Sequence, residues 1–111
     1  MNRANRLNKS ADVKRVRRNG KTTAHPFLLL VALPNQQQGL RVAVTAGRSV
    51  GGAVQRNRAK RVMRAAIQAL LGQIKPDMDI LLLARPDILL AKSTEVQEVL
   101  QELFKRAKLL K

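Results

Sequence analysis

Apolar and polar positions divide this chain into short segments with different periods. Val13 and Val16 lie three residues apart among basic side chains, which predicts a helix over residues 11–18. Ser10 is expected to cap the start of this helix. Asn19-Gly20 is expected to end it, with the glycine in a left-handed conformation.

Three apolar runs predict strands. Phe27–Leu33 is unbroken and has the length of a strand buried on both faces. Residues 40–46 alternate, with Leu40, Val42 and Val44 on one face, and a polar turn over residues 34–39 separates the two runs. Two such runs across a short loop predict a hairpin. A third buried strand is predicted over Asp79–Ala84.

Two longer segments have helical spacing. One begins after the loop over residues 47–52 and is expected to continue to about Leu71, where Gly72 stops it. The other begins near Thr94, which has the spacing of a capping box with Gln97. Its apolar residues return at steps of three and one, so this last helix should pack one face on the core.

The first of these helices has the most distinctive polar pattern. Placed at 100° per residue, its apolar residues fall on one side: Ala59, Val62, Met63, Ala66, Ile67 and Leu70. Arg58, Arg61 and Arg64 lie near the opposite direction and are expected to form an exposed ridge. Arg56 and Lys60 fall on the flank of the apolar sector. Since an unpaired arginine cannot enter a core, Arg56 should overhang the edge of the sheet.

Length and composition limit the classes of function. A chain of 111 residues is expected to form one domain over residues 1–111. It has no cysteine, which excludes disulfides, thiolate metal sites and cysteine nucleophiles. The single histidine, His25, has no second histidine to make a ligand pair and is interpreted as a solvated loop residue. No apolar run reaches a membrane span and the start lacks a signal peptide's apolar region, so a cytoplasmic protein without a membrane partner is expected.

The net charge of +15 is distributed unevenly. Residues 1–75 contain 16 Lys and Arg and one acid, Asp12, whereas residues 76–111 contain 6 basic and 6 acidic residues. This self-repulsion does not help folding, and a polyanionic partner would neutralise it. A nucleic acid explains the asymmetry best, and anionic lipid is the weaker alternative. Residues 1–9 are then expected to be a flexible basic arm of the single RNA-binding domain.

The basic ridge has two interpretations. Charged helix faces are usually only solvated, but here no acid occurs between Asp12 and Asp77 to relieve the repulsion. Basic residues at a helix start also oppose the helix dipole, and the free N–H groups of the first turn attract phosphate. Binding of RNA or DNA is therefore favoured. With only Phe27 and Phe104 as aromatic residues, affinity should come from phosphate contacts, shape and 2′-hydroxyls rather than from stacking.

The segment from Gly51 to Arg64, GGAVQRNRAKRVMR, resembles the signature helix of the bacterial ribonuclease P protein family. That pattern is roughly G-x-A-V-x-R-N-R-x-K-R, followed by an apolar pair and another arginine. Further similarities cover nearly the whole chain: Asn5-Arg6-Leu7, Gly20, Leu40-Arg41-Val42 and the Asp79–Arg85 strand before Pro86.

The resemblance implies an α+β fold. In this two-layer α/β sandwich, a small mixed sheet of about four strands packs on helices, with a left-handed βαβ crossover (a ribosomal protein S5 domain 2-like fold). It also implies the protein subunit of a tRNA-processing ribonucleoprotein. There the catalytic RNA uses Mg²⁺ to release the 5′ leader of precursor tRNA. The protein is expected to have no catalytic residues, to bind no metal itself and to need no protein partner.

The resemblance also implies roles for particular residues. It places Arg56 and Asn57 toward a cleft that contacts the leader. Arg58, Lys60, Arg61 and Arg64 are expected to contact the catalytic RNA, and Arg48 in the preceding loop is also expected to bind RNA. No leader-binding role is carried over to positions where the family often has an aromatic residue or a lysine and this chain does not: Val13, Arg17, Val31 and Ser49.

Two other functions stay open at this point. A ribosomal or other structural RNA-binding protein, with no role in cleavage, would have the same size and charge. A protein-only nuclease would need clustered carboxylates. The basic part of the chain offers only Asp12, and Asp77, Asp79 and Asp87 are interpreted as turn caps beside a strand.

Overall fold

The computed structural model describes all residues except 1–5, 8 and 37–38. The described residues form three α-helices: α1 (Ser10–Asn19), α2 (Ala53–Gln68) and α3 (Ser93–Arg106). They also form four strands: β1 (Lys21–Ala24), β2 (Leu28–Pro34), β3 (Arg41–Ala46) and β4 (Met78–Ala84). Short 3-10 helices lie at three connections: η2 (Arg48–Val50), η3 (Leu71–Gln73) and η4 (Pro86–Leu90).

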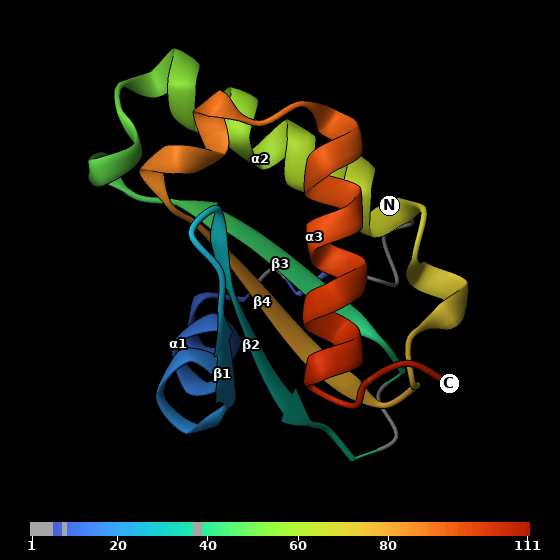
Figure 1. Cartoon of the computed structure of the whole chain (residues 1–111). Coiled ribbons are helices and arrows are strands. Elements are labelled where there is room, and N and C mark those ends of the chain that lie inside the picture. The colour runs from blue at the N-terminus through green and yellow to red at the C-terminus, as the bar shows by residue number, and fades with distance from the viewer. Residues whose placement is uncertain (1–5, 8, 37–38) are drawn as a thin grey trace.

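The strands form one mixed sheet in the order β1-β2-β4-β3 (Figure 1). β2 is antiparallel to β1 and to β4, whereas β3 is parallel to β4. Because α2 joins the parallel neighbours β3 and β4, these elements form a βαβ crossover. The predicted α+β fold is confirmed. The predicted hairpin between residues 27–33 and 40–46 is wrong, because β4 lies between these two strands.

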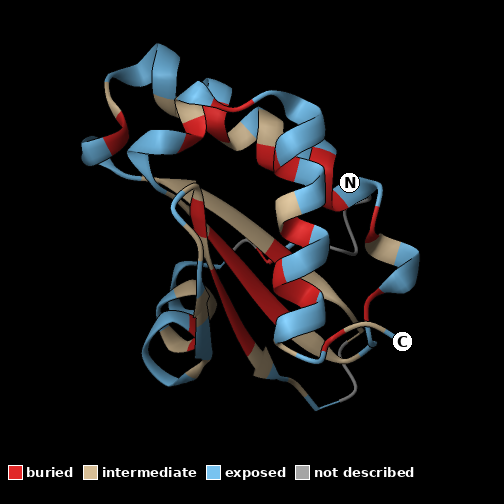
Figure 2. Ribbon diagram, viewed as in Figure 1, coloured by how far each residue is buried: buried red, intermediate tan, exposed pale blue. Residues whose placement is uncertain are grey.

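Helices cover both faces of the sheet. α2 and α3 pack on one face and form the main core, which includes Leu30, Met63, Leu82 and Phe104. On the other face, α1 buries Val16 against a smaller cluster that contains Leu7, Val31 and Leu81. Figure 2 shows the buried centre of the sheet between these helices. The layer formed by α1 is thus an addition to the two-layer sandwich that the sequence predicts.

The close contact of α1 with the sheet depends on Gly20. A Cβ atom at this position would lie 2.6 Å from the Val16 carbonyl oxygen and 2.7 Å from Cγ1 of Val31. The predicted left-handed conformation of Gly20 is wrong, since its φ is −76°. Steric room, not backbone conformation, therefore requires glycine here. The predicted Ser10 cap is also wrong: Lys9 precedes the first turn and makes no side-chain cap.

Two other helix boundaries differ slightly from the sequence prediction. α2 ends at Gln68 and is followed by η3 around Gly72. α3 begins at Ser93, and the Lys92 N–H donates to Oε1 of Glu95 at 3.1 Å. The capping interaction therefore lies two residues before the predicted Thr94–Gln97 pair.

The basic arm is held to the sheet at its end. Leu7 is buried, and its N–H donates to the carbonyl oxygen of Val42 in β3 at 2.8 Å. The rest of the predicted arm falls largely outside the described residues, at 1–5 and 8.

Candidate RNA interface

α2 presents most of its basic residues to solvent. Ala59, Met63, Ala66 and Ile67 are buried against the core. Arg58, Arg61 and Arg64 are exposed, and Arg56 and Lys60 are half-buried. This agrees with the helical projection. In the described part of the chain, no carboxylate forms an ion pair with these five cations. The exposed face of α2, which we call the arginine ridge (Arg58, Arg61 and Arg64), is therefore uncompensated positive charge.

The loop before α2 brings further polar groups to the same end of the molecule. Gly51 has a φ of 142°, in the region that favours glycine. Gly52 precedes α2 and provides no side-chain cap, so among the described residues the first N–H groups of this helix have no side-chain acceptor. Arg48 and Asn57 are both exposed beside this helix start. The arrangement favours an anion there, as the dipole and the free donors require.

Arg56 and Asn57 do not face the same way. Arg56 is half-buried, whereas Asn57 is exposed, as expected for neighbours 100° apart on a helix. The Nε atom of Arg56 is buried and has no hydrogen-bond partner among the residues that the structure describes. A buried donor without an acceptor costs free energy. An RNA oxygen that reached Arg56 would remove this cost.

A groove crosses the sheet face that α1 only partly covers. α1 buries Val31 and Leu81, which are directly paired. At the other end of this face, the paired row Leu29, Leu83 and Thr45 is only half-buried. These three residues form the floor of a groove of about 370 Å³. The rest of its lining comes from α1, from η2 and the residue before it, and from the end of β4 and the two residues that follow: Arg17, Gly47, Ser49, Ala84, Arg85 and Pro86.

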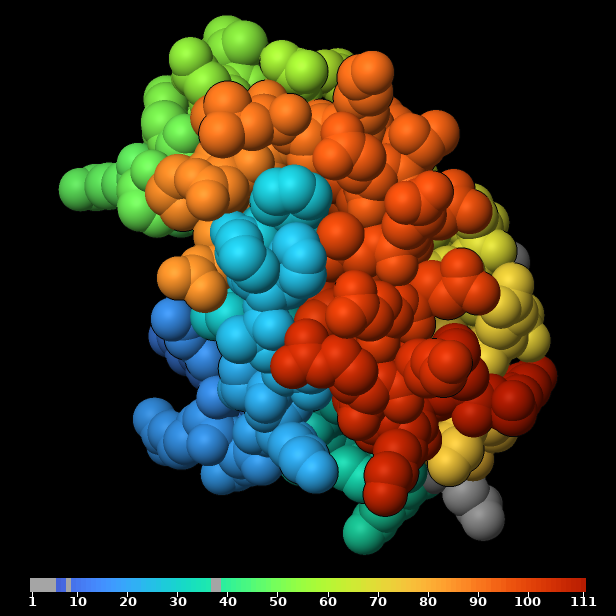
Figure 3. Space-filling view, viewed as in Figure 1, coloured from blue at the N-terminus to red at the C-terminus, as the bar shows by residue number. Residues whose placement is uncertain are grey.

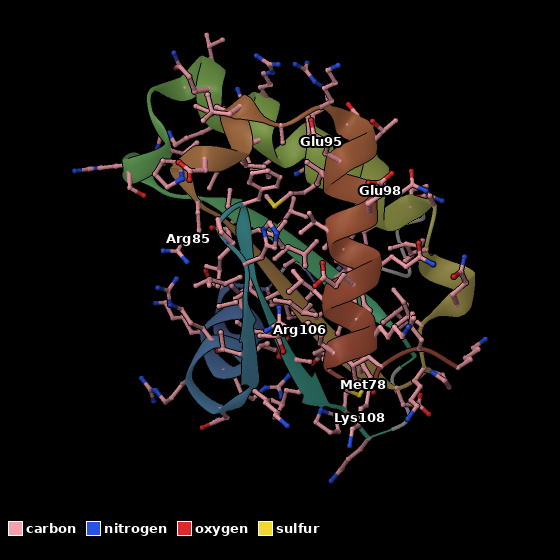
Figure 4. All side chains as sticks on the ribbon, in the orientation of Figure 1. Met78, Arg85, Glu95, Glu98, Arg106 and Lys108 are labelled. Carbon is pink, nitrogen blue, oxygen red and sulfur yellow. The ribbon has the colours of Figure 1, made fainter. Side chains whose placement is uncertain are left out.

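The lining of this groove suits a single strand of nucleic acid. Leu29 and Leu83 offer an apolar floor for bases, while Arg17 and Arg85 are exposed cations at which phosphates can bind. Figure 4 shows Arg85 at the edge of the molecule, on the side away from α3. The resemblance implied a cleft, but the pattern of apolar residues did not indicate where it lies. Residues 27–33 are apolar without interruption, so the sequence gives no sign that one face of β2 is half open.

Asp79 in β4 holds α1 in place beside the groove. It is completely buried and accepts hydrogen bonds from both Nε (2.8 Å) and Nη2 (2.9 Å) of Arg41 in β3. Arg15 in α1 donates to it at 2.8 Å, and so does the Asn35 amide. Asp12 lies 3.4 Å from Arg15. The interpretation of Asp79 as a turn cap is therefore wrong, although Asp77 does accept the Gly39 N–H, at 3.0 Å.

The electrostatics keep this cluster ionised. Burial raises the pKa of Asp79, but the hydrogen bonds from Arg41, Asn35 and Arg15 outweigh it, and the pKa lies below its ordinary value. The same hydrogen bonds raise the pKa values of Arg15 and Arg41. Since Arg15 belongs to α1 and Asp79 to β4, the cluster fixes the helix over one half of the sheet and leaves the groove open over the other.

The described residues include no group of three or more His, Cys, Asp and Glu side chains that could hold a metal ion. In the same part of the chain, no helix has both the length and the apolar character needed to cross a membrane.

The chain is similar to proteins of one family in sequence and in structure. The profile of the family described as Ribonuclease P matches residues 1–108. The ribonuclease P protein component of Chloroflexus aurantiacus is 38% identical, over 99% of this chain and 82% of the relative. That of Herpetosiphon aurantiacus is 34% identical, over 98% and 89%.

Solved structures agree in fold. The structure of the Staphylococcus aureus RNase P protein is similar with a TM-score of 0.83 at 25% identity, covering 96% of this chain and 98% of that one. For the RNase P protein from Thermotoga maritima, the TM-score is 0.80 at 25% identity, with 91% and 96% covered.

Proposed function

Because this chain belongs to the ribonuclease P protein family, we propose that its two basic surfaces bind two RNAs of one holoenzyme. The chain is the protein component of ribonuclease P, the endoribonuclease that matures the 5′ end of tRNA, and the RNA component carries catalysis. The alternative of a structural RNA-binding protein without a role in cleavage is not favoured, since the relatives are named as components of this enzyme.

The arginine ridge binds the catalytic RNA in this proposal. The observation that carries it is the absence of any ion pair to the cations of α2 among the described residues. Each guanidinium that meets a phosphate releases condensed counterions, which favours binding. This surface is extended by Asn57 and Lys60 on the same helix and by Arg48 in η2, before the helix.

The sheet groove holds the 5′ leader of precursor tRNA in this proposal. A leader is single-stranded, so its bases can turn toward Leu29 and Leu83 while its phosphates meet Arg17 and Arg85. The groove ends at Gly47 and Ser49, in the loop that leads to α2. RNA in the groove would therefore lie near the start of α2, where Arg56 has an unsatisfied donor.

We place the Mg²⁺ ions of the reaction on the RNA component. The described carboxylates of this chain do not form a cluster that fits an ion, and Asp79 is occupied by two arginines. The chain contributes binding and orientation of the RNAs, and we expect it to act in the cytoplasm, where tRNA precursors are processed.

The role of the ridge can be tested by replacing Arg58, Arg61 and Arg64 together with glutamine. The matched control replaces Lys92, Lys105 and Lys108, which are also exposed, so that both variants lose the same charge. Binding to the catalytic RNA is measured over a range of salt concentrations. The ridge variant should bind at least about tenfold more weakly, and the slope of log K against log salt should fall by roughly 2 to 3. Equal slopes for the two variants would mean that the arginine ridge is only a solvated face and does not bind the catalytic RNA.

A further inference from the structure

Beyond the groove, the same end of the sheet has a second hollow of about 290 Å³. One wall is the end of β1 and the turn that follows it, with Ala24, His25 and Pro26. The other is the corner after β4, with Arg85, Pro86 and Asp87. Figure 3 shows the turn, in light blue, against the η4 segment, in orange. The Arg85 N–H donates to the Phe27 carbonyl oxygen at 2.9 Å, which holds the two walls together.

The groove and this hollow are continuous in two respects. Arg85 and Pro86 line both of them. In addition, Ala24 of the hollow pairs with Leu29 of the groove floor, so one cross-strand row runs from Ala24 through Leu29 and Leu83 to Thr45. Paired residues of neighbouring strands lie on the same face of a sheet. A strand of RNA that follows this row therefore passes Arg85 and reaches His25.

We propose that the hollow is a second nucleotide subsite, in which a more distal base of the single-stranded leader stacks on His25 while its phosphate lies beside Arg85. This inference rests on the proposed role of the groove in holding the leader.

The ring of His25 is already oriented. Its Nδ1 atom accepts the Phe27 N–H at 3.0 Å. The Phe27 ring meets it edge-on, with 4.9 Å between centroids and 65° between planes. A side chain held in this way loses little conformational freedom when a base stacks on it. Histidine is among the rings on which unpaired bases stack in RNA-binding proteins. No aromatic ring lines the groove itself, so His25 is the first ring that the leader meets.

The charges of the hollow decide which part of the nucleotide enters it. Arg85 is exposed, and no carboxylate in the described part of the chain forms an ion pair with it. Asp87 lines the same wall two residues further along the chain, and its carboxylate repels phosphate and accepts hydrogen bonds. The phosphate therefore stays at Arg85 and the base faces Asp87. Bases with an amino group can donate to this carboxylate, whereas uracil has no amino group to offer it.

The test compares two precursor tRNAs in the reconstituted holoenzyme. The short leader ends within the groove, and the long leader extends past Arg85. His25→Ala should weaken binding of the long-leader precursor about fivefold or more, the size of effect that loss of base stacking produces. Binding of the short-leader precursor should change less than about twofold. His25→Phe keeps a ring and should restore most of the affinity for the long leader. Lys105→Gln, an exposed change on α3, serves as the control.

Two results would overturn the proposal: long-leader binding that His25→Ala leaves unchanged, or equal losses for both leaders. Nuclear magnetic resonance of the unmodified chain gives a second readout, because its single histidine has one set of ring signals. These signals should shift when a long-leader oligonucleotide is added, and unmoved signals at saturation contradict the stacking contact. If the unmodified holoenzyme binds no leader at all, the proposed role of the groove fails and this subsite fails with it.

Discussion

Replacement of Asp79 by asparagine tests how α1 is fixed to the sheet. The change keeps the size of the side chain and removes its charge, so Arg41 and Arg15 lose the carboxylate that they share. Removal of one partner from a buried ion pair usually costs about 3–5 kcal/mol. Here the side chains of Arg41 and Arg15 are 23% and 39% exposed, and Asp12 lies within reach of both. Water and Asp12 can therefore compensate in part, and we expect a loss of about 3 kcal/mol.

Urea unfolding at pH 7, followed by circular dichroism, measures this loss. Glu98→Gln on the exposed face of α3 is the control and should change the free energy of unfolding by less than about 0.5 kcal/mol. The pH dependence gives an independent check. Because the pKa of Asp79 is lowered in the folded state, its stabilisation is fully present above the unfolded pKa of about 3.9 and is lost as the pH falls through the folded value.

The difference between the unmodified chain and Asp79→Asn should therefore be constant from pH 7 to about pH 5 and shrink below pH 4. A variant that matches the unmodified chain in stability at pH 7 would refute the reasoning. So would a difference that grows as the pH falls.

Three further predictions concern packing and binding. Gly20→Ala places a Cβ atom 2.6 Å from the Val16 carbonyl oxygen, and it should cost about 1–3 kcal/mol; an unchanged thermal midpoint would contradict this. Arg41→Lys cannot reproduce the two-pronged contact with Asp79 and should cost about 1 kcal/mol in urea unfolding, clearly less than Asp79→Asn. Thr45→Glu adds a negative charge to the groove floor. It should weaken holoenzyme binding of precursor tRNA about tenfold but leave binding of mature tRNA unchanged, and an equal effect on both would exclude a leader in the groove.

The sequence predicted which face of each element is buried better than it predicted which strands pair with each other. Alternation along residues 40–46 correctly placed Val42 and Val44 toward the main core. Helical spacing correctly separated the arginine ridge from the buried side of α2. Both patterns depend on the local geometry of one element, which its own residues largely determine. Strand pairing does not have this property. The short loop after β2 indicated that β2 forms a hairpin with β3. Instead, β2 pairs with β4, more than forty residues further along the chain.

The groove and Asp79 could not be predicted for a related reason. Asp79 begins the strand that the sequence predicted to be buried, but its partners Arg15 and Arg41 are 64 and 38 residues away, so nothing near it in the sequence indicates the ion pairs. Leu29 belongs to an unbroken apolar run, and only the position of α1 determines that its side of the sheet stays open. From the sequence, we interpreted His25 as a solvated loop residue. Its ring contact with Phe27 and the wall formed by Arg85 could not be foreseen, because both arise only in the folded chain. The predicted roles in RNA binding stay predictions for all seven residues: Arg48, Arg56, Asn57, Arg58, Lys60, Arg61 and Arg64.

Reconstitution with the cognate catalytic RNA tests the central claim most directly. Precursor tRNA is incubated at low Mg²⁺ concentration with the RNA alone, with the chain alone and with both, and release of the 5′ leader is followed. Addition of the unmodified chain should accelerate cleavage by the RNA, and the variant without the arginine ridge should require more protein for the same rate. The chain alone should release no leader. Failure of the chain to stimulate the RNA at any salt concentration, or cleavage by the chain without RNA, would contradict the account.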